Sequence, residues 1–346
     1  MLTNNKTFFI AEAGVNHNGS IKMACKLIDI ASDAGADFVK FQHTNPNLIS
    51  SKTNLTSDQK LTTKSKINQK KLTESFHLDW EKAYPILIKR SKKKKIKFLT
   101  SVFSSSDYDK VKKYKLGFIK IASGEIVNLP LLINISKSKD TVFLSTGGSN
   151  LTEIERAIKI LKQNYKKKKI FLLHCVSSYP APINQINLRS IEYLIKKTNC
   201  EVGYSDHGLG SDHLLTAIGF GAKVIEKHFT IRKSLNGPDH KISSDPSELK
   251  KIIKRIRKIE LSLGTFDKKI QVCEKKNISI IRQSLHASKL IKKNTILNKN
   301  NITLMRPYNG INPMNYLKII NKYKTKKEYK KQDPIRLINI KKIKRY

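Results

Sequence analysis

The sequence predicts an α/β fold, a (β/α)8 TIM barrel followed by a small C-terminal β-rich domain. Two observations predict the barrel. Eight short β-type runs alternate with longer helical stretches through most of the chain, which is the pattern of βα units around a parallel sheet. Polar residues stand at the ends of nearly all these runs, where a barrel of this kind carries its active site. A doubly wound sheet is disfavoured because no GxGxxG turn occurs.

The expected strands are short apolar runs that begin and end at turn or charged residues. They cover residues 8–11, 38–42, 97–103, 118–123, 141–146, 170–175, 201–206 and 222–229. Helical patterns are expected near residues 20–34, 79–94, 107–114, 152–165, 188–198 and 211–220, with 246–263 as a final helix. Eight such units in about 250 residues is the size expected of a closed barrel.

The composition divides the chain into three parts. Residues 1–266 form the expected barrel domain, residues 267–281 a charged linker, and residues 282–346 a small domain without βα rhythm. Within the barrel, residues 43–73 make a long polar loop after the second strand. A loop of this length is more often an active-site cover than a plain connector, so we expect it to close over the barrel mouth.

Charge and cysteine content exclude several classes of protein. The chain carries 68 Lys and Arg against 27 Asp and Glu, a net charge of +41. Such an excess is typical of nucleic-acid binders, but the lysine runs lack the interleaved aromatic residues that stack on bases, so we expect no nucleic-acid partner. No apolar run approaches the ~18 residues of a membrane span, and we expect no membrane association. Four scattered cysteines without a CxxC pair indicate reduced thiols and a cytoplasmic protein.

Charged and hydroxyl side chains at the strand ends predict an anion site. Residues two apart on a strand face the same way, as do Lys40 and Gln42. Lys40 and Lys120 end separate strands, and lysine binds phosphate as a point charge. Hydroxyls at Ser101, Ser123 and Ser205 could complete the shell. Each lysine alone could instead pair with a barrel glutamate, but the set together favours phosphate.

Two histidines at neighbouring strand ends predict a metal site. His207 and His228 lie beside Asp206 and Glu226, and two imidazoles with water suit a borderline divalent ion such as Mn²⁺. A third histidine, His174, is expected to be structural.

Two loops could add side chains to the same mouth. Prolines around Tyr179 could hold its ring over the barrel, although an ordinary turn is equally compatible with the sequence. Asp239, in the loop after the last strand, could bind sugar hydroxyls or simply cap its turn.

At these residues the chain resembles the sialic acid synthase family, which includes N-acetylneuraminate and N,N'-diacetyllegionaminate synthases. The resemblance covers nearly the whole chain, and its specificity lies in the number and order of the motifs. The matching segments are AEAGVNHNG at 11–19, FVKFQ at 38–42, KIASGE at 120–125, LSTG at 144–147, GYSDH at 203–207, IEKHFT at 225–230 and GPDH at 237–240.

The C-terminal part resembles the family's antifreeze-like (SAF) domain, through RQSL at 282–285, IKK at 291–293 and RPYNGI at 306–311. In such enzymes this domain caps the partner's barrel in a domain-swapped homodimer. The resemblance therefore implies a homodimer in which Arg306 reaches the acyl group of the sugar in the other subunit.

The resemblance also implies residue roles. Phosphoenolpyruvate would be held by Lys40, Ser101, Lys120, Ser123, Ser177 and Ser205. The sugar would be held by Gln42, Asp239 and Arg306, and the groups acting at the reacting centre would be Glu12, Glu125, Glu226 and Tyr179. His207 and His228 would bind Mn²⁺ or Mg²⁺. The chain departs from the family pattern at Ser101 (commonly Thr), Ser177 (Asn in some relatives) and Tyr308 (usually Gly).

The activity implied is that of an N-acetylneuraminate synthase-type enzyme. It condenses phosphoenolpyruvate with an open-chain N-acetylmannosamine-type sugar and gives a nonulosonate and phosphate by C–O cleavage. One alternative is N,N'-diacetyllegionaminate synthesis from a 2,4-diacetamido-trideoxymannose. A more distant alternative is a pyruvate aldolase with Lys120 as the Schiff-base nucleophile.

Overall fold

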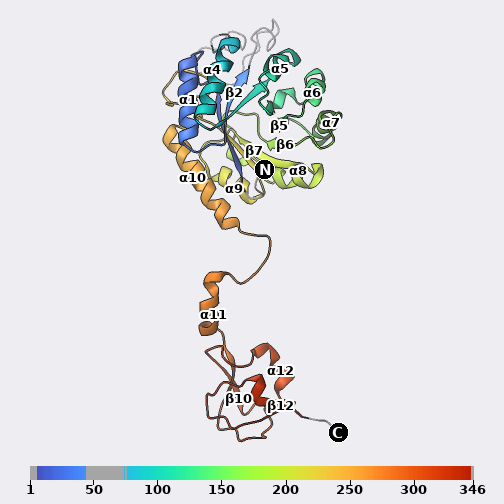
Figure 1. Ribbon diagram of the computed structural model, residues 1–346, viewed down its shortest axis with the longest axis vertical. Coiled ribbons are helices and arrows are strands. Elements are labelled where there is room, and N and C mark those ends of the chain that lie inside the picture. The colour runs from blue at the N-terminus through green and yellow to red at the C-terminus, as the bar shows by residue number, and fades with distance from the viewer. Residues whose placement is uncertain (1–5, 44–73, 75, 344–346) are drawn as a thin grey trace. The chain divides into compact units, whose positions relative to one another are not determined.

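A computed structural model describes residues 6–43, 74 and 76–343, so the expected loop cover at 43–73 lies almost wholly outside the described residues. The chain forms two compact units, Met1–Gly264 and Thr265–Tyr346. No helix in the described part of the chain is long and apolar enough to cross a membrane. Figure 1 shows the course of the chain through each unit.

The first unit is a closed barrel of eight parallel strands. In order around the barrel the strands are β1 (Phe8–Gly14), β2 (Phe38–His43), β3 (Lys97–Val102), β4 (Phe118–Ile121), β5 (Thr141–Ser145), β6 (Ile170–His174), β7 (Glu201–Asp206) and β8 (Val224–His228). β1 pairs with β8 and closes the sheet, with Glu12 opposite His228. The predicted (β/α)8 barrel is therefore confirmed.

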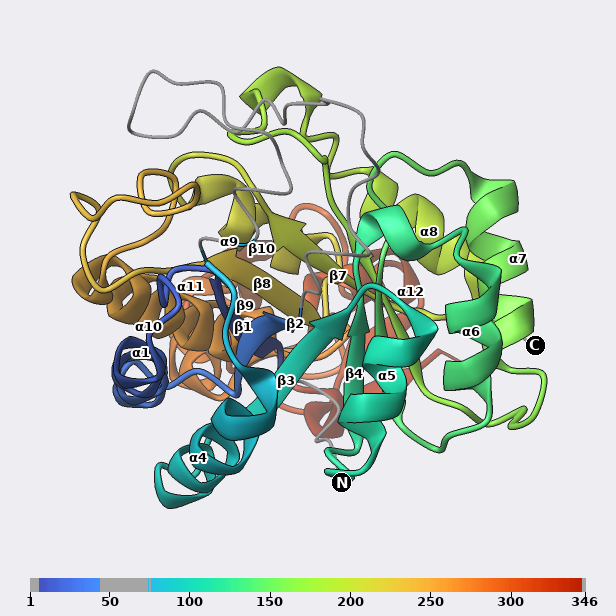
Figure 2. The same ribbon diagram turned by 90° about the horizontal axis from the view of Figure 1, so that it is seen from above.

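Helices surround the strands, as Figure 2 shows. They are α1 (Ile21–Asp33), α4 (Trp80–Lys93), α5 (Ser105–Lys112), α6 (Leu129–Ser136), α7 (Leu151–Leu161), α8 (Ser190–Thr198), α9 (Asp212–Gly219) and α10 (Pro246–Leu263). Their limits follow local capping: the Ser20 side chain accepts from Met23 N at the start of α1, and Asp245 makes a capping box with Glu248 at the start of α10. α6 was not predicted from the sequence.

The barrel interior changes from apolar to charged along the strands. On β2, Phe38 joins an apolar layer with Ile10, Phe143 and Phe171, and Lys40 follows two residues later on the same face. The intervening Val39 packs outward in the larger core between strands and helices. The apolar layer closes one end of the barrel, and the charged residues occupy the other end.

The second unit contains two small antiparallel sheets. β9 (Ser284–Ala287) pairs with β10 (Ile302–Met305), and β11 (Tyr323–Thr325) pairs with β12 (Ile340–Lys342). A compact apolar core that includes Leu285, Ile291 and Tyr329 holds them together. α12 (Tyr316–Ile319) is a single turn, and α11 (Lys275–Ile281) occupies the end of the segment expected to be linker.

Candidate active site

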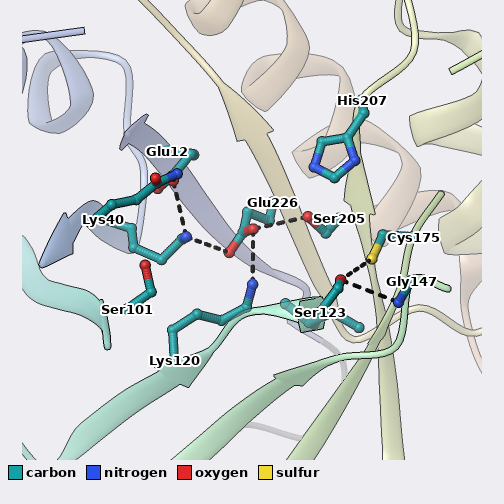
Figure 3. A network of polar contacts seen from close by, with 12 residues as sticks. Glu12, Lys40, Ser101, Lys120, Ser123, Gly147, Cys175, Ser205, His207 and Glu226 are labelled. Carbon is teal, nitrogen blue, oxygen red and sulfur yellow. Dashed lines mark hydrogen bonds and ion pairs between the residues drawn. The ribbon is translucent and has the colours of Figure 1, made fainter. Parts of the chain in front are cut away.

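Four charged side chains meet at the carboxyl end of the barrel (Figure 3). Lys40 Nζ lies 3.0 Å from Glu12 Oε1 and 3.7 Å from Glu226 Oε2. Lys120 Nζ lies 3.2 Å from the other oxygen of Glu226, which also accepts a 2.8 Å hydrogen bond from Ser205 Oγ. All four charged groups are buried. The strand register causes this convergence, because Glu12 stands opposite Lys40 and Ser205 opposite Glu226.

Burial and charge pairing set the ionisation of this network. Burial opposes ionisation of Glu226, but the ammonium groups of Lys120 and Lys40 outweigh it and lower the pKa of Glu226 to about 2. Burial likewise opposes the charge of Lys40, but Glu12 and Glu226 raise its pKa. At Lys120 burial prevails and lowers the pKa, and at Glu12 burial prevails and raises it. The two lysines therefore differ in how firmly each holds its proton.

Hydroxyl and thiol groups gather next to the charged layer. Ser123 Oγ lies 3.2 Å from Cys175 Sγ and accepts a 3.2 Å hydrogen bond from Gly147 N. A Cβ placed on Gly147 would lie 2.4 Å from Ser177 Oγ and 2.9 Å from Ser123 Oγ, so these two hydroxyls converge on the glycine. Ser101 is buried within β3. Ser123 and Ser177 therefore lie together at Gly147, and Ser205 bonds to Glu226 in the charged layer.

His207 and His228 end neighbouring strands, and their ring centroids are 5.8 Å apart. The Tyr179 ring packs 4.2 Å from that of His207 and 6.2 Å from that of His228. His228 Nδ1 lies 3.7 Å from Asp239 Oδ2. A Cβ on Gly14 would meet Asp239, His228 and Gln42 within 3.5 Å. The structure therefore groups the predicted metal ligands with most of the predicted sugar ligands.

The donor set suits a divalent metal. Burial lowers the pKa of both His207 and His228, which favours the neutral imidazole that binds metals. His207 Nδ1 contacts the Val176 carbonyl, which leaves Nε2 available. Buried His228 Nδ1 and Asp239 Oδ1 have no hydrogen-bond partner in the described structure. Within that part of the chain no cluster of three or more His, Cys, Asp or Glu forms a full metal site, so two histidines would need water or substrate to complete the coordination.

The predicted residue Glu125 lies apart from the four charged side chains Glu12, Lys40, Lys120 and Glu226 of the barrel mouth. Glu125, in a short turn after β4, accepts a 2.6 Å hydrogen bond from Asn128, and no contact in the described structure joins it to Glu12 or Glu226. Burial, the largest cause, raises the pKa of Glu125. Arg306 belongs to the second unit, where it is exposed at the end of β10.

Asp206 does not lie beside the two histidines, contrary to the prediction. It points to the outer face of the barrel and pairs with Lys227 Nζ at 2.5 Å and His213 Nε2 at 2.8 Å. The reason is alternation along β7, which places Ser205 inside and Asp206 outside. His174 Nε2 lies 2.8 Å from the Ile186 carbonyl oxygen, a contact compatible with the structural role expected for this histidine.

Gly14, Gly147 and Cys175 also belong to the site and were not predicted from the sequence. Gly147 and Gly14 leave room for the side chains that converge on them, a property with no signature in one sequence. Cys175 did carry a signal, because it directly follows β6 at the carboxyl end of the barrel.

The chain is similar to proteins of one family. A family model described as the NeuB family matches residues 27–268. The chain is 46% identical over 333 residues to N,N'-diacetyllegionaminic acid synthase of Campylobacter jejuni subsp. jejuni serotype O:2, covering 96% of this chain and 99% of that protein. It is 36% identical over 317 residues to the N,N'-diacetyllegionaminic acid synthase of Legionella pneumophila subsp. pneumophila, with 90% and 89% covered.

A solved structure gives a similar result. The crystal structure of N-acetylneuraminic acid (sialic acid) synthetase from Leptospira borgpetersenii serovar Hardjo-bovis, in complex with citrate, has a TM-score of 0.72 to this chain and is 35% identical in sequence. The match covers 80% of this chain and 94% of that one.

Proposed function

The chain belongs to the NeuB family, and from this premise we propose that its barrel mouth joins phosphoenolpyruvate to an N-acylated amino-sugar aldehyde. The products are a nonulosonate and phosphate, and the chain is an enzyme. The observation that carries the proposal is the meeting of Lys40 and Lys120 at Glu226, with Ser205 on the same carboxylate. Such a network can exchange its internal ion pairs for those of an incoming polyanion.

Phosphoenolpyruvate would bind where the lysines and hydroxyls meet. Its phosphate and carboxylate would take up hydrogen bonds from Lys40, Lys120, Ser101, Ser123, Ser177 and Ser205. Burial strengthens each of these interactions relative to water. The negative charge of bound phosphoenolpyruvate would also take over part of the attraction that Glu226 now provides to both lysines. The two ammonium groups would therefore keep a negative partner throughout binding.

The sugar would occupy the side of the mouth near Gly14. Gln42, Asp239 and Tyr179 would bind and orient the open-chain sugar, and Arg306 of a partner subunit would contact its acyl group. Dependence on a divalent metal fits the family, and we assign Mn²⁺ or Mg²⁺ to His207 and His228. When bound, the ion would supply Lewis-acid polarisation of the sugar carbonyl oxygen.

The chemistry proceeds by attack of the alkene carbon of phosphoenolpyruvate on the aldehyde carbon, which forms the new C–C bond. Positive charge develops at the carbon that carries the phosphate ester. The carboxylates of Glu12 and Glu226, and that of Glu125 if its turn closes inward, would stabilise this charge. Water adds to the same carbon, and collapse of the tetrahedral intermediate breaks the C–O bond and releases phosphate. Holding both substrates in line would supply much of the rate.

Two sugars remain candidates for the proposed reaction. An N-acetylmannosamine-type sugar is supported by similarity to the Leptospira N-acetylneuraminic acid synthetase. A 2,4-diacetamido-trideoxymannose is supported by the two N,N'-diacetyllegionaminic acid synthases, one of which is 46% identical to this chain.

The organisation of the protein is part of the proposal. We take residues 1–266 as the synthase domain, 267–281 as the linker and 282–346 as an SAF domain that reaches the partner in a domain-swapped homodimer. A cytoplasmic location is supported by the four free cysteines, Cys25, Cys175, Cys200 and Cys273.

The test uses purified protein, Mn²⁺ and phosphoenolpyruvate labelled with ¹⁸O in the bridging position, with each sugar offered in turn. We expect sugar-dependent release of phosphate that carries the label. Label retained in the nonulosonate would exclude C–O cleavage. Borohydride treatment with pyruvate provides the contrast, because covalent trapping at Lys120 would establish the Schiff-base alternative instead.

A further inference from the structure

A cavity of about 520 Å³ lies on the outer side of β8. Its walls come from the segment after β7 (Leu209 to Ser211), the segment after β8 (Lys241 to Ser244) and one face of α10. Lys227, which alternates with Glu226 and His228 on β8, also lines it. Because alternate residues on a strand face opposite ways, this cavity lies behind the barrel wall and is separate from the candidate active site.

The cavity is strongly cationic. Seven of its fifteen described lining residues are Lys or Arg, compared with 68 of 346 in the whole chain. The one acidic lining residue, Glu248, lies 2.6 Å from Lys233 and is already paired. Lys227 is likewise paired, with Asp206, and Arg255 is paired with Asp212. The cavity is therefore more than twice as rich in basic residues as the whole chain, and ion pairs with described acids account for three of its seven cations.

Four lysines carry the uncompensated charge. Lys241, Lys251, Lys254 and Lys258 all line the cavity, and none has an ion pair with a described residue. The last three repeat at intervals of three and four along α10, the spacing that places side chains on one helical face. Four ammonium groups around one cavity repel one another, and a bound polyanion would remove that cost.

The remaining walls provide other contacts. Ser211 and Ser244 add hydroxyl groups. Leu209, which is 63% exposed, gives an apolar surface together with Ile242 and Ile252. The volume suits a ligand of drug or cofactor size.

We propose that this cavity binds a phosphorylated small molecule with an apolar or aromatic body, a ligand of the nucleotide class. The phosphates contact Lys241, Lys251, Lys254 and Lys258, and the body packs on Leu209. This site is independent of the proposed condensation, because its residues are not those of the barrel mouth.

The test measures binding of ATP and of inorganic tripolyphosphate to the full-length protein by calorimetry at physiological ionic strength. Replacing three cavity lysines by glutamine (K251Q, K254Q, K258Q) is compared with a matched triple on α4 (K89Q, K92Q, K93Q). The lysines of both sets are exposed, and both triples change the net charge by the same amount. We expect the cavity triple to weaken ATP binding at least tenfold and the α4 triple to leave it within twofold.

A second variant separates a nucleotide site from a simple charge effect. L209A should weaken the binding of ATP several-fold and leave the affinity for tripolyphosphate unchanged. The proposal is overturned if the wild-type protein binds no ATP at millimolar concentration, or if both triples weaken it equally. It is also overturned if tripolyphosphate binds as tightly as ATP and L209A affects neither. Phosphate release in the condensation assay should be retained in the cavity triple without ATP, which distinguishes failure at this site from failure of the proposed function.

Discussion

Lys120 Nζ lies 3.2 Å from Glu226 Oε1 in the buried centre of the barrel mouth, although 106 residues separate them in the chain. Removing one member of a buried pair leaves the other charge unpaired and costs about 3–5 kcal/mol. We expect K120M and E226Q each to lower the free energy of unfolding. Because Lys40 also contacts Glu226, K120M should cost less than E226Q.

The double variant K120M/E226Q should be more stable than the sum of the two single effects predicts, since it leaves fewer unpaired charges. Urea unfolding of the four proteins at pH 7 gives this coupling energy. Strictly additive effects would mean that the two side chains do not interact in solution.

The histidine pair gives a second prediction. H207A and H228A should each weaken Mn²⁺ binding by more than about 100-fold and abolish metal-dependent phosphate release, because these two imidazoles are the only nitrogen ligands that we assign to the ion. Calorimetric titration with Mn²⁺ measures the binding. H174N is the control, since His174 ends a nearby strand but its Nε2 lies 2.8 Å from the Ile186 carbonyl oxygen and its ring packs on that of Tyr204; the Mn²⁺ affinity of this variant should stay unchanged. Normal metal activation in H207A would remove His207 from the site.

The third prediction concerns the space above Gly147. In G147A the new Cβ would lie 2.4 Å from Ser177 Oγ and 2.9 Å from Ser123 Oγ, so both hydroxyls must move. We expect the KM for phosphoenolpyruvate to rise roughly tenfold, equivalent to about 1.4 kcal/mol, with little change in the KM for the sugar.

G124A is the matched control for this substitution. Gly124 lies in the turn after β4, and a Cβ there would meet nothing within 4 Å. Its kinetic constants should match those of the wild type. Equal effects of G124A and G147A would point to a general disturbance of the mouth and not to the two serines.

The barrel and much of its charged end could be predicted from the sequence, because successive side chains on a short strand alternate between its two faces. The pairs Lys40 with Gln42 and Glu226 with His228 could be assigned to one face from their spacing alone. The same rule, applied to β7, would have placed Asp206 on the opposite face from Ser205. The prediction that Asp206 lies beside the two histidines relied on its position next to His207 in the sequence. It was wrong, because Asp206 pairs with Lys227 on the other face of the sheet.

Other features could not be predicted from one sequence. α6 has the sequence LPLLINIS, with a proline in its first turn and only two polar residues, so no polar face marks a helical period. The proximity of Ser123 to Ser177 depends on where two loops pass each other at Gly147. Such tertiary relationships depend on packing between distant segments, which local propensity does not encode.

The last prediction concerns pH and stability. Lys168 is buried, and its Nζ donates to the carbonyls of Ile135 and Ser138 at 2.8 and 2.5 Å. Burial lowers its pKa from 10.5 to about 8. Between these values the unfolded chain holds a proton that the folded chain has released. The stability of the wild type relative to K168M should therefore rise with pH from about 8 to about 10.5, by at most about 1.4 kcal/mol per pH unit.

Urea unfolding at pH 7.5 and pH 9.5 tests this prediction, with K167M as the control because Lys167 is exposed. Other groups that titrate in this range affect all three proteins alike, so only the difference between wild type and variant is informative. Below pH 8 Lys168 in the folded protein is a buried ammonium hydrogen-bonded to two carbonyls. Above pH 8 it is a neutral amine, and its burial no longer carries the desolvation cost of a charge. For K167M, the difference in unfolding free energy from the wild type should stay constant between the two pH values. The same constancy in K168M would show that Lys168 retains its proton on folding and that the two carbonyls compensate fully for its burial.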